Sequence, residues 1–572
     1  MSMKPALTDL PIKTAESGFY RGFSEIVTIF SKVLIAALVV WAVAFPEHSG
    51  AVLKGINGFI LSSFGAWYIW TVALFVIVCI GLAIWPAGGR LKLGQEGDVP
   101  EFNNFSWFSM MFGAGIGVGM LTWAVAEPVY HFNNNPEVIQ GITTGGTADN
   151  IRMAYKWSFL HWGLGAWACY AIAGLALGYF SYRRGLPLTM RSSLTPLFGN
   201  KLSGSTGHLI DIVAVVATVL GVAQTLGFGV EQFVSGLTRI GISGLTNEAG
   251  TANTAGVLVA IVVIMTASTI SALSGVGKGI KWLSNINMGL SIALLTFFLL
   301  FGSTFFGLKA LVVGIWDYLI ALPAMSFTVW SGDGNPDSVA TKLEGWQGGW
   351  SVFYWAWWIA FAPFVGLFLA RISKGRSIRE FVLGAMIVPS LMCFVWFTWA
   401  GGTAIELTME QAASGAIEKV TDSEIFAAPD GDKIFAMTNY MLSPISAGLA
   451  WAMAFMIVVL LMTYLVTTAD SAVLIVNTIN AAGDEGPKAR PHILFWGAAL
   501  GAVVAALLLV GGLKAIQTAM VIGALPFSVV MVLQCFAIVK AIYNDGRREK
   551  AGLVTTYPPI VKPDPLHPAG VE

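Results

Sequence analysis

Six aromatic side chains crowd one apolar segment, FYWAWWIAF, which begins at Phe353. The faces of such rings attract a fixed organic cation, by about 0.5 to 2 kcal/mol per contact depending on desolvation. An aromatic belt at the membrane interface is the alternative interpretation. A belt lies at the ends of a span, however, whereas Trp357 and Trp358 lie shortly before Pro363. Pro363 and Gly366 are expected to weaken the helix at mid-depth, so the segment predicts a binding site.

A second aromatic group lies in the segment HWGLGAWACYAIAG. On a regular helix Trp162, Trp167 and Tyr170 fall within an arc of about 140°, because successive residues turn by about 100°. A lipid-facing or core stripe would explain this group if it stood alone. Together with the tryptophans of the first segment it forms two halves of an aromatic box. His161 is interpreted as a packed or interfacial histidine.

Hydroxyl groups gather in a third apolar segment. Thr467, Thr468 and Ser471 place oxygen atoms in an uncharged part of a helix, which suits a weakly held alkali ion. The glycine run GAGIGVG would add backbone carbonyls if it is unwound, because glycine loosens a helix and admits a ligand to the backbone. There is an alternative for each group. The hydroxyls would instead bond to carbonyls of their own helix, and the glycines would form a face that packs closely against another helix. Asp470 is expected to be functional because carboxylates are costly within a membrane, and Glu127 is placed near the interface.

Composition bounds the class of protein. Hydrophobic residues make up 56% of the 572 residues and charged residues 11%, which excludes a soluble globular chain and indicates a polytopic membrane protein. A net charge of zero argues against nucleic acid as a partner. The four cysteines show no paired spacing, and the six histidines form no HExxH motif or triad. We therefore predict no enzymatic activity and no cofactor, and the nearly uncharged centre argues against a channel.

The elements that must position these residues are membrane-spanning helices. Because about 20 apolar residues cross a bilayer, the sequence predicts an all-α protein with twelve spans. Lys and Arg concentrate in the loops after spans four, six, eight and ten, which places both termini in the cytoplasm. The predicted spans are 24–45, 61–86, 105–132, 151–181, 208–238, 254–273, 283–306, 346–370, 380–400, 441–482, 492–511 and 515–541.

Spans three and eight carry matching defects, the glycine run in one and Pro363 in the other. They are five helices apart, so the second set enters the membrane from the opposite face. Interrupted helices at corresponding places in inverted repeats indicate the mid-membrane site of a secondary transporter. The predicted divisions are a tail at 1–23, two additional helices at 24–104, a first repeat at 105–306, an interfacial amphipathic helix and loop at 307–345, a second repeat at 346–543 and a tail at 544–572.

Several motifs together resemble the betaine/choline/carnitine transporter family. They are the segment 350–380, the run GAGIGVG with the following AEP, the pattern HWxLxxWxxY and the segment SGVGKGIKWLSNINMG at 274–289. The resemblance extends from about residue 107 to the end of the twelfth span. It implies a LeuT-like core of five plus five helices in inverted repeat, assembled as a homotrimer among the lipids of the cell inner membrane.

The resemblance also implies site residues. For the cargo these are Trp162, Trp167, Tyr170 and Trp357 as the aromatic box, Trp358 and Phe361 along the pathway, and Ile116 and Gly117. For one sodium ion they are backbone groups of Gly113, Ile116 and Tyr464 with the hydroxyls of Thr467 and Thr468. A second sodium site would use Thr218 and Phe364, but Val222 replaces its second threonine, which leaves that ion short of one ligand.

The leading hypothesis is sodium-coupled uptake, by alternating access, of a small trimethylammonium or dimethylsulfonium zwitterion such as glycine betaine or dimethylsulfoniopropionate (DMSP). Exchangers of the family that work without sodium place a cationic side chain in the fifth span, and this chain has none between His208 and Thr238. The alternatives are a proton-coupled choline symporter, with Asp470 or Glu127 titrating, and a sodium-independent carnitine or betaine exchanger. The short, nearly balanced tail does not predict osmotic regulation.

Overall fold

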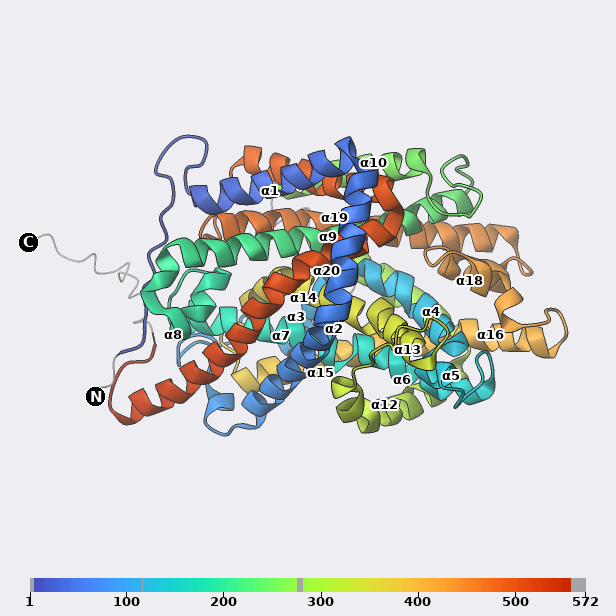
Figure 1. Cartoon of the computed structure of the whole chain (residues 1–572), viewed down its shortest axis with the longest axis horizontal. Coiled ribbons are helices and arrows are strands. Elements are labelled where there is room, and N and C mark those ends of the chain that lie inside the picture. The colour runs from blue at the N-terminus through green and yellow to red at the C-terminus, as the bar shows by residue number, and fades with distance from the viewer. Residues whose placement is uncertain (1–4, 116, 275–280, 557–572) are drawn as a thin grey trace, which may run out of the picture.

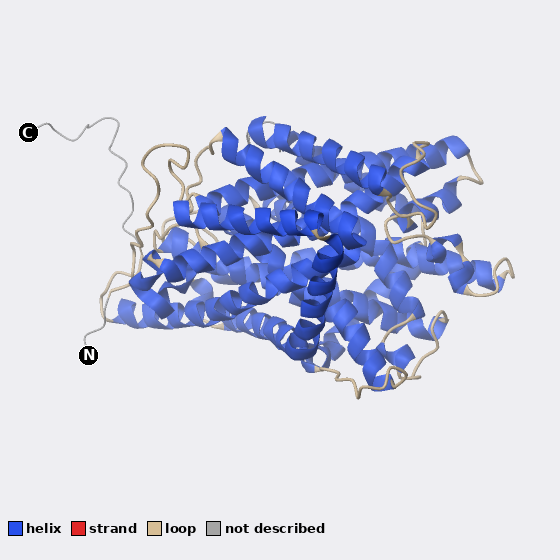
Figure 2. Cartoon of the chain, turned by 45° about the horizontal axis from the view of Figure 1, so that its top comes forward, coloured by secondary structure: helices blue, strands red, loops and turns tan. Residues whose placement is uncertain are grey.

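The computed structural model describes residues 5–115, 117–274 and 281–556, and within these ranges the chain forms helices and no β-strand. Figure 2 shows the helices packed into one bundle with short connections. The prediction of an all-α polytopic protein is confirmed. In chain order the α-helices are α1 (Glu25–Ala44), α2 (Pro46–Ile84), α3 (Asn104–Gly115), α4 (Gly117–Asn133), α5 (Pro136–Ile139), α6 (Ile151–Trp162), α7 (Leu164–Gly178), α8 (Thr195–Phe198), α9 (Ser205–Arg239), α10 (Thr254–Ser274), α11 (Lys281–Phe301), α12 (Thr304–Phe327), α13 (Val339–Gln347), α14 (Phe353–Ile372), α15 (Ile378–Trp396), α16 (Gly402–Ala413), α17 (Glu424–Ala427), α18 (Lys433–Leu442), α19 (Ala447–Asn480) and α20 (Arg490–Lys550).

Within the described ranges, eleven helical segments are long and apolar enough to cross a membrane. They differ from the twelve predicted spans at three places. α20 contains the last two predicted spans, which meet at Gly511 and Gly512, where the backbone is not helical. α3 and α4 together form the predicted third span, but each alone is too short to be counted. α12, which the sequence predicts to be interfacial, is long and apolar enough to be counted.

The predicted break at Pro363 and Gly366 is wrong. Both residues lie inside α14, which is continuously helical. The irregular turn precedes this helix, in the π-helix η7 (Gly348–Val352). Gly366 instead allows α14 to approach α7, because a Cβ atom there would lie 2.5 Å from the Cβ of Ala173. The glycine therefore serves close helix packing, as small residues do in membrane bundles.

The regular helix expected across the second aromatic group is also interrupted. α6 ends at Trp162 and α7 begins at Leu164, with a non-helical backbone at Gly163 (φ −92°, ψ −145°). A side chain at Gly163 is excluded, because its Cβ atom would lie 2.7 Å from the hydroxyl of Tyr318. Trp162 and Tyr170 therefore project from two different helices, and the arc predicted for a single helix does not apply.

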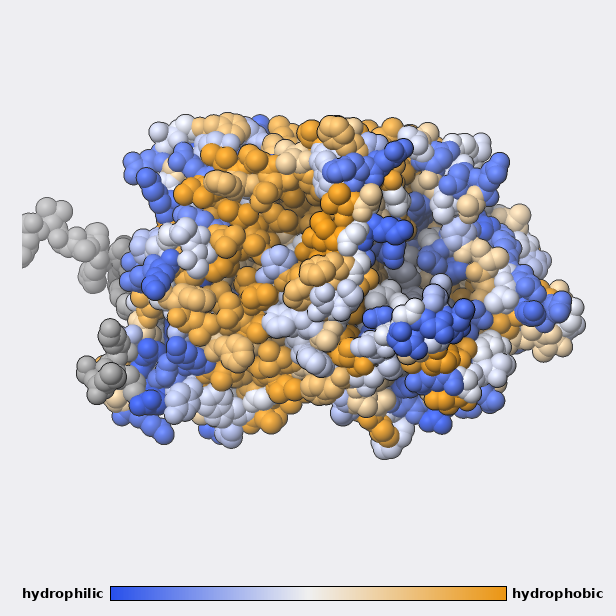
Figure 3. Space-filling view, in the orientation of Figure 1, coloured by the Kyte–Doolittle hydropathy of each residue, from blue (hydrophilic) through white to orange (hydrophobic). Residues whose placement is uncertain are grey.

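The surface has an apolar middle and polar ends. In Figure 3, apolar side chains cover most of the middle of the visible face, and hydrophilic side chains gather toward its left and right ends. The start of the described chain and the end of α20 lie at the same end of the bundle, which we call the terminus end (Figure 1). A bilayer normal along the long axis of the bundle fits this division. The four cysteines are free and buried inside it: Cys79, Cys169, Cys393 and Cys535.

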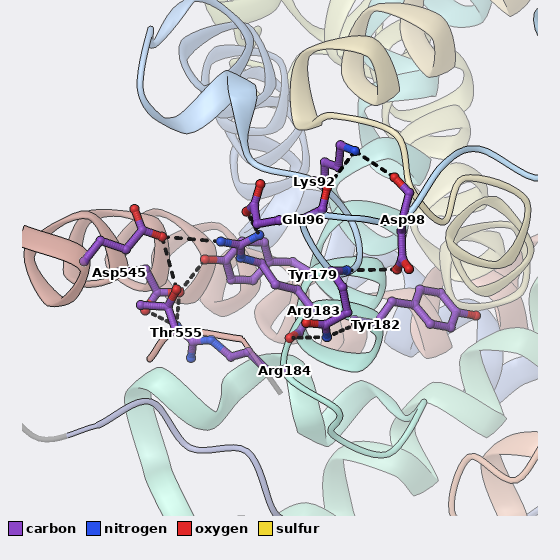
Figure 4. Close-up of polar contacts among 11 residues, drawn as sticks. Lys92, Glu96, Asp98, Tyr179, Tyr182, Arg183, Arg184, Asp545 and Thr555 are labelled. Carbon is purple, nitrogen blue, oxygen red and sulfur yellow. Dashed lines mark hydrogen bonds and ion pairs between the residues drawn. The ribbon is translucent and has the colours of Figure 1, made fainter. Parts of the chain in front are cut away.

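Charge pairs close the terminus end (Figure 4). Asp545 of α20 accepts hydrogen bonds from the hydroxyl of Tyr179 at 2.5 Å and from the guanidinium of Arg184 at 2.8 Å. Arg183 donates to Glu96 at 2.8 Å. Because Tyr179 belongs to the π-helix η3 (Tyr179–Arg183) that follows α7, Asp545 ties the last turns of α20 to the end of α7. Arg183, at the end of η3, holds the loop that contains Glu96.

A second buried ion pair anchors the loop before α9. The Nε atom of Arg191 donates to Asp211 at 2.6 Å, and the backbone N–H of Arg191 donates to the other carboxylate oxygen at 3.1 Å. Arg191 also donates to the carbonyl of Leu202 at 3.3 Å. Both side chains of the pair are at most 1% exposed. The pair therefore holds the loop against the first turns of α9 from a buried position.

Candidate functional site

Three rings from three helices meet inside the bundle. The ring of Trp358 in α14 lies 5.1 Å from that of Trp162 in α6 and 5.5 Å from that of Tyr170 in α7, measured between centroids. The neighbouring Trp357 lies 6.4 Å from Trp162. These four side chains are at most 4% exposed. The structure thus brings the two aromatic groups together, and we call these four rings the aromatic cluster.

The rings of the cluster meet edge to face. Aromatic rings with centroids about 4.5–7 Å apart are in direct contact. The plane of Trp358 lies at 85° to that of Trp162 and at 76° to that of Tyr170. Because a cation attracted by a ring lies within about 6 Å of its centroid, rings that meet at such angles present more than one face to the same cation.

Trp167 and Phe361 reach the cluster through Tyr170. The ring of Trp167 lies 5.4 Å from that of Tyr170, and the ring of Phe361 lies 6.3 Å from it. Phe361 also packs against Phe364 at 4.9 Å. These two predicted site residues therefore lie at the edge of the cluster.

Two rings that the sequence analysis did not single out join the cluster. Tyr354 lies 5.7 Å from Trp162, and Phe397 of the π-helix η8 (Phe397–Gly401) lies 5.1 Å from it. Tyr354 precedes Trp358 by four residues, so helical periodicity could have placed both on one face. No pattern in the sequence connects Phe397 with Trp162, since π-helical geometry is not encoded by apolar spacing.

Glycines of α4 give the rings room. A Cβ atom on Gly119 would lie 3.2 Å from the rings of both Trp162 and Trp357. A Cβ atom on Gly117 would lie 2.8 Å from the ring of Tyr464 in α19. The glycine run therefore brings α4 against the aromatic cluster and against the helix of the predicted sodium ligands. Ile116 lies outside the described residues, and Gly113 lies in the last turns of α3.

A buried carboxylate adjoins the cluster. Glu127 is fully buried inside the bundle, and the expectation that it lies near the membrane interface stays a prediction. Its Oε2 atom accepts hydrogen bonds from the indole N–H of Trp162 at 2.6 Å and from the hydroxyl of Tyr354 at 2.5 Å. Its Oε1 atom lies 2.7 Å from Nδ1 of His161 and 3.3 Å from Nε2 of His131. The sequence showed each residue separately, but only the fold brings α4, α6 and α14 together around one carboxylate.

Glu127, His131 and His161 also have metal-ligand types and spacing. One atom of each lies within 4.8 Å of the others, which makes them the candidate metal group of the described part of the chain. The hydrogen bonds among the three, and that between His161 Nε2 and the hydroxyl of Ser351 at 3.0 Å, already give these atoms partners. Glu127, His131 and His161 therefore form a hydrogen-bonded group, in which Nδ1 of His131 has no partner.

Thr467, one of the predicted sodium ligands of α19, contacts α11. The hydroxyl of Thr467 bonds back to the carbonyls of Thr463 and Tyr464 at 3.0 and 3.1 Å, which is the arrangement proposed as the alternative to ion binding. The same oxygen accepts a hydrogen bond from Nδ2 of Asn287 at 3.1 Å. The Oδ1 atom of Asn287 is buried and has no hydrogen-bond partner. The unpaired oxygen of Asn287 therefore lies close to the hydroxyl of Thr467. Thr468, the next residue of α19, is half-buried.

Asp470 lies one turn further along α19 and is buried. It accepts hydrogen bonds from the hydroxyl of Ser271 in α10 at 2.5 Å and from that of Ser471 at 3.1 Å. Two hydroxyl donors thus compensate this carboxylate, and they also connect α19 to α10.

Thr218 of the second predicted sodium site bonds back to its own helix. Its hydroxyl donates to the carbonyl of Ala214 at 2.7 Å. Thr218 and Val222 line a small apolar cavity together with residues of α19 and α20, and Phe364 is not among the lining residues. The second sodium site stays a prediction.

Comparison with known proteins decides the family. A family model described as BCCT, betaine/carnitine/choline family transporter, matches residues 26–547. The chain belongs to this family. A probable glycine betaine transporter of Desulfitobacterium hafniense is 37% identical, over 91% of this chain and 97% of that protein. The glycine betaine transporter OpuD of Bacillus subtilis is 36% identical, over 90% and 94%. The osmo-independent choline transporter BetT1 of Acinetobacter baylyi is 36% identical, over 91% and 93%.

Membership in the BCCT family confirms the resemblance predicted from the motifs. The chain is a multi-pass membrane protein of a transporter family and is not an enzyme. The match covers both aromatic segments, Glu127 and α19, so every part of the site described above lies within the family's region.

Proposed function

We propose that this BCCT protein takes up a small trimethylammonium or dimethylsulfonium zwitterion, of the glycine betaine or DMSP type, by sodium-coupled symport. The observation that carries the proposal is the buried aromatic cluster, in which Trp358 contacts both Trp162 and Tyr170. Rings replace the weak hydration of a quaternary head without a formal charge on the binding surface, so the cargo can leave again. Relatives named as glycine betaine transporters support this class of cargo.

Sodium coupling is supported by the oxygen atoms around α19. Thr467, Thr468 and the unpaired Oδ1 of Asn287 are neutral ligands, which suit a monovalent ion that must be released in each cycle. We propose that the ion binds where Gly117 packs against Tyr464. We further propose a homotrimer in the inner membrane with both termini in the cytoplasm, as the lysine and arginine distribution favours.

A choline carrier is the second candidate. A relative named as a choline transporter is as similar as the betaine transporters are. The buried group of Glu127, His131 and His161 favours it further, since such a group could exchange a proton during transport.

Uptake into proteoliposomes tests the proposed function. We expect labelled glycine betaine to accumulate only with an inward sodium gradient, and to be displaced by DMSP, choline or carnitine in an order that identifies the cargo. Accumulation driven by a pH gradient in the absence of sodium would instead establish the choline-type proton symporter. Exchange of internal for external betaine without any ion gradient would contradict symport altogether.

Thr467→Ala is expected to raise the sodium concentration for half-maximal betaine uptake about tenfold or more, because one hydroxyl ligand of a charged group contributes about 1.5–3 kcal/mol. Uptake at saturating sodium should be recovered in large part. The matched control is Thr478→Ala, which removes a hydroxyl that also bonds back to its own helix, α19, at 3.1 Å. An unchanged sodium dependence in Thr467→Ala would show that its hydroxyl is only back-bonded.

A further inference from the structure

Glu127 adjoins the aromatic cluster but has no part in the proposed sodium-coupled symport. The aromatic cluster binds a cation through ring faces alone, yet a fully buried carboxylate bonds directly to one of its rings. Burial of a carboxylate is costly unless its charge is compensated. Ionisable residues buried in membrane proteins are usually functional, and Glu127 lies at the edge of a proposed cation site. We therefore expect Glu127 to take part in recognising the charge of the cargo.

The geometry indicates that Glu127 is an anion. Its Oε2 atom faces the indole N–H of Trp162, which can only donate, and the hydroxyl of Tyr354. These bonds measure 2.6 and 2.5 Å, as short as bonds to charged acceptors are. The Oε1 atom has a ring nitrogen of His161 at 2.7 Å and one of His131 at 3.3 Å. Four possible donors around two oxygens stabilise the ionised form.

The neighbours of the two histidines are consistent with their neutral form. Ser351 places its hydroxyl 3.0 Å from Nε2 of His161, so the hydroxyl can donate to that nitrogen while Nδ1–H donates to Glu127. The Nδ1 atom of His131 is buried and has no hydrogen-bond partner, which suits an unprotonated nitrogen. With both rings neutral, the group of three residues carries a net charge of −1.

The charge of Glu127 reaches the cargo through two rings. Trp162 contacts Trp358 at 5.1 Å and Trp357 at 6.4 Å, and Tyr354 contacts Trp162 at 5.7 Å. An N–H or O–H group that donates to an anion pushes electron density into its own ring, which makes the ring face more negative. The site is also shielded from water, so the carboxylate attracts a cation directly and with little screening.

We propose that Glu127 determines specificity for positive charge: acting through Trp162 and Tyr354, it makes the aromatic cluster prefer a quaternary cation to an uncharged molecule of the same shape. This inference rests on the proposed function, since it assumes that the cluster is the cargo site. Glu127 is a positioning residue in this role, because Trp162 and Tyr354 lie between it and the cluster.

A pair of ligands with equal shape and different charge tests this role. Choline and 3,3-dimethyl-1-butanol differ in having nitrogen or carbon at the centre of the head. We expect Glu127→Gln to weaken choline binding to purified protein in lipid nanodiscs about tenfold or more, while binding of the neutral alcohol changes less than about twofold. Glu127→Asp, which keeps the charge, should restore much of the preference for choline.

The controls separate charge from structure. Glu406→Gln in α16 removes a half-buried carboxylate outside the cluster and should leave both affinities unchanged. Tyr354→Phe removes one donor to Glu127 and keeps the ring; it should lower the choline-to-alcohol preference about threefold. It also keeps the proposal testable if Glu127→Gln fails to fold.

The outcomes are distinct. Equal weakening of both ligands in Glu127→Gln, or an unchanged preference in Tyr354→Phe, would mean that Glu127 only holds α4, α6 and α14 together, and would overturn the inference while leaving the proposed function intact. Wild-type protein that binds neither choline nor glycine betaine would overturn the proposed function, and the inference with it.

Discussion

Trp358→Ala is expected to abolish saturable uptake of glycine betaine at concentrations that saturate the wild-type protein. Trp358 contacts both Trp162 and Tyr170, so its removal opens the cluster on two sides and removes one cation–π contact. In a desolvated site such a contact contributes about 2 kcal/mol or more, which is about 30-fold or more in apparent affinity. Uptake kinetics in proteoliposomes measure the effect.

Trp357→Ala serves as the informative comparison. Trp357 lies further from Trp162, at 6.4 Å, and its indole N–H donates to the hydroxyl of Thr225 at 3.2 Å. The motif resemblance favoured Trp357 as the box residue, whereas the contacts give Trp358 the larger expected effect. Trp282→Ala, at a 66% exposed position of α11, controls for loss of a tryptophan as such. Wild-type affinity in both Trp357→Ala and Trp358→Ala would refute the aromatic cluster as the cargo site.

Asp211→Ala is expected to destabilise the folded protein by about 3–5 kcal/mol, because it leaves the buried guanidinium of Arg191 without its carboxylate. Arg191 is fully buried, and its other contacts, with the carbonyl of Leu202 and with Nδ1 of His208, are to groups without negative charge. The measurement is the temperature at which detergent-solubilised protein loses its monodisperse peak in size-exclusion chromatography.

Asp149→Ala, at an exposed aspartate before α6, is the matched control and should melt at the wild-type temperature. The double variant Asp211→Ala with Arg191→Met should recover part of the loss, because it removes the unpaired charge as well as its partner. A melting temperature unchanged in Asp211→Ala would show that the ion pair of Arg191 and Asp211 contributes nothing to stability.

Hydropathy and residue type predicted the class of fold well. Apolar runs of about 20 residues are a strong signal because the bilayer imposes their length. The sequence also pointed to the aromatic residues that meet in the structure. Trp162, Tyr170 and Trp358 lie in segments unusually rich in aromatic residues, although a membrane span does not require them.

Local backbone geometry was predicted less well. Pro363 lies within a regular helix because the neighbouring helices of a packed bundle tolerate it, while Gly163 interrupts a helix where no proline gives warning. In both cases the deciding contact is tertiary: Ala173 excludes a side chain at Gly366, and Tyr318 excludes one at Gly163. Such contacts join segments distant in sequence, so a single sequence without relatives does not reveal them.

The hydrogen-bond partners of Glu127 could not be predicted from the sequence either. Its donors come from α4, α6 and α14, and Tyr354 follows Glu127 by more than two hundred residues. A carboxylate at the end of a predicted span resembles an interfacial residue until the helices that cover it are placed. Burial therefore had to come from the structure.

The four buried cysteines have a practical chemical consequence. A membrane-impermeant maleimide reacts with exposed thiols, and all four native thiols lie inside the bundle, out of its reach. The native protein is therefore expected not to react with that reagent. A single cysteine introduced at a loop position would be the only labelled residue, and labelling in intact cells would then report on which face of the membrane that loop resides.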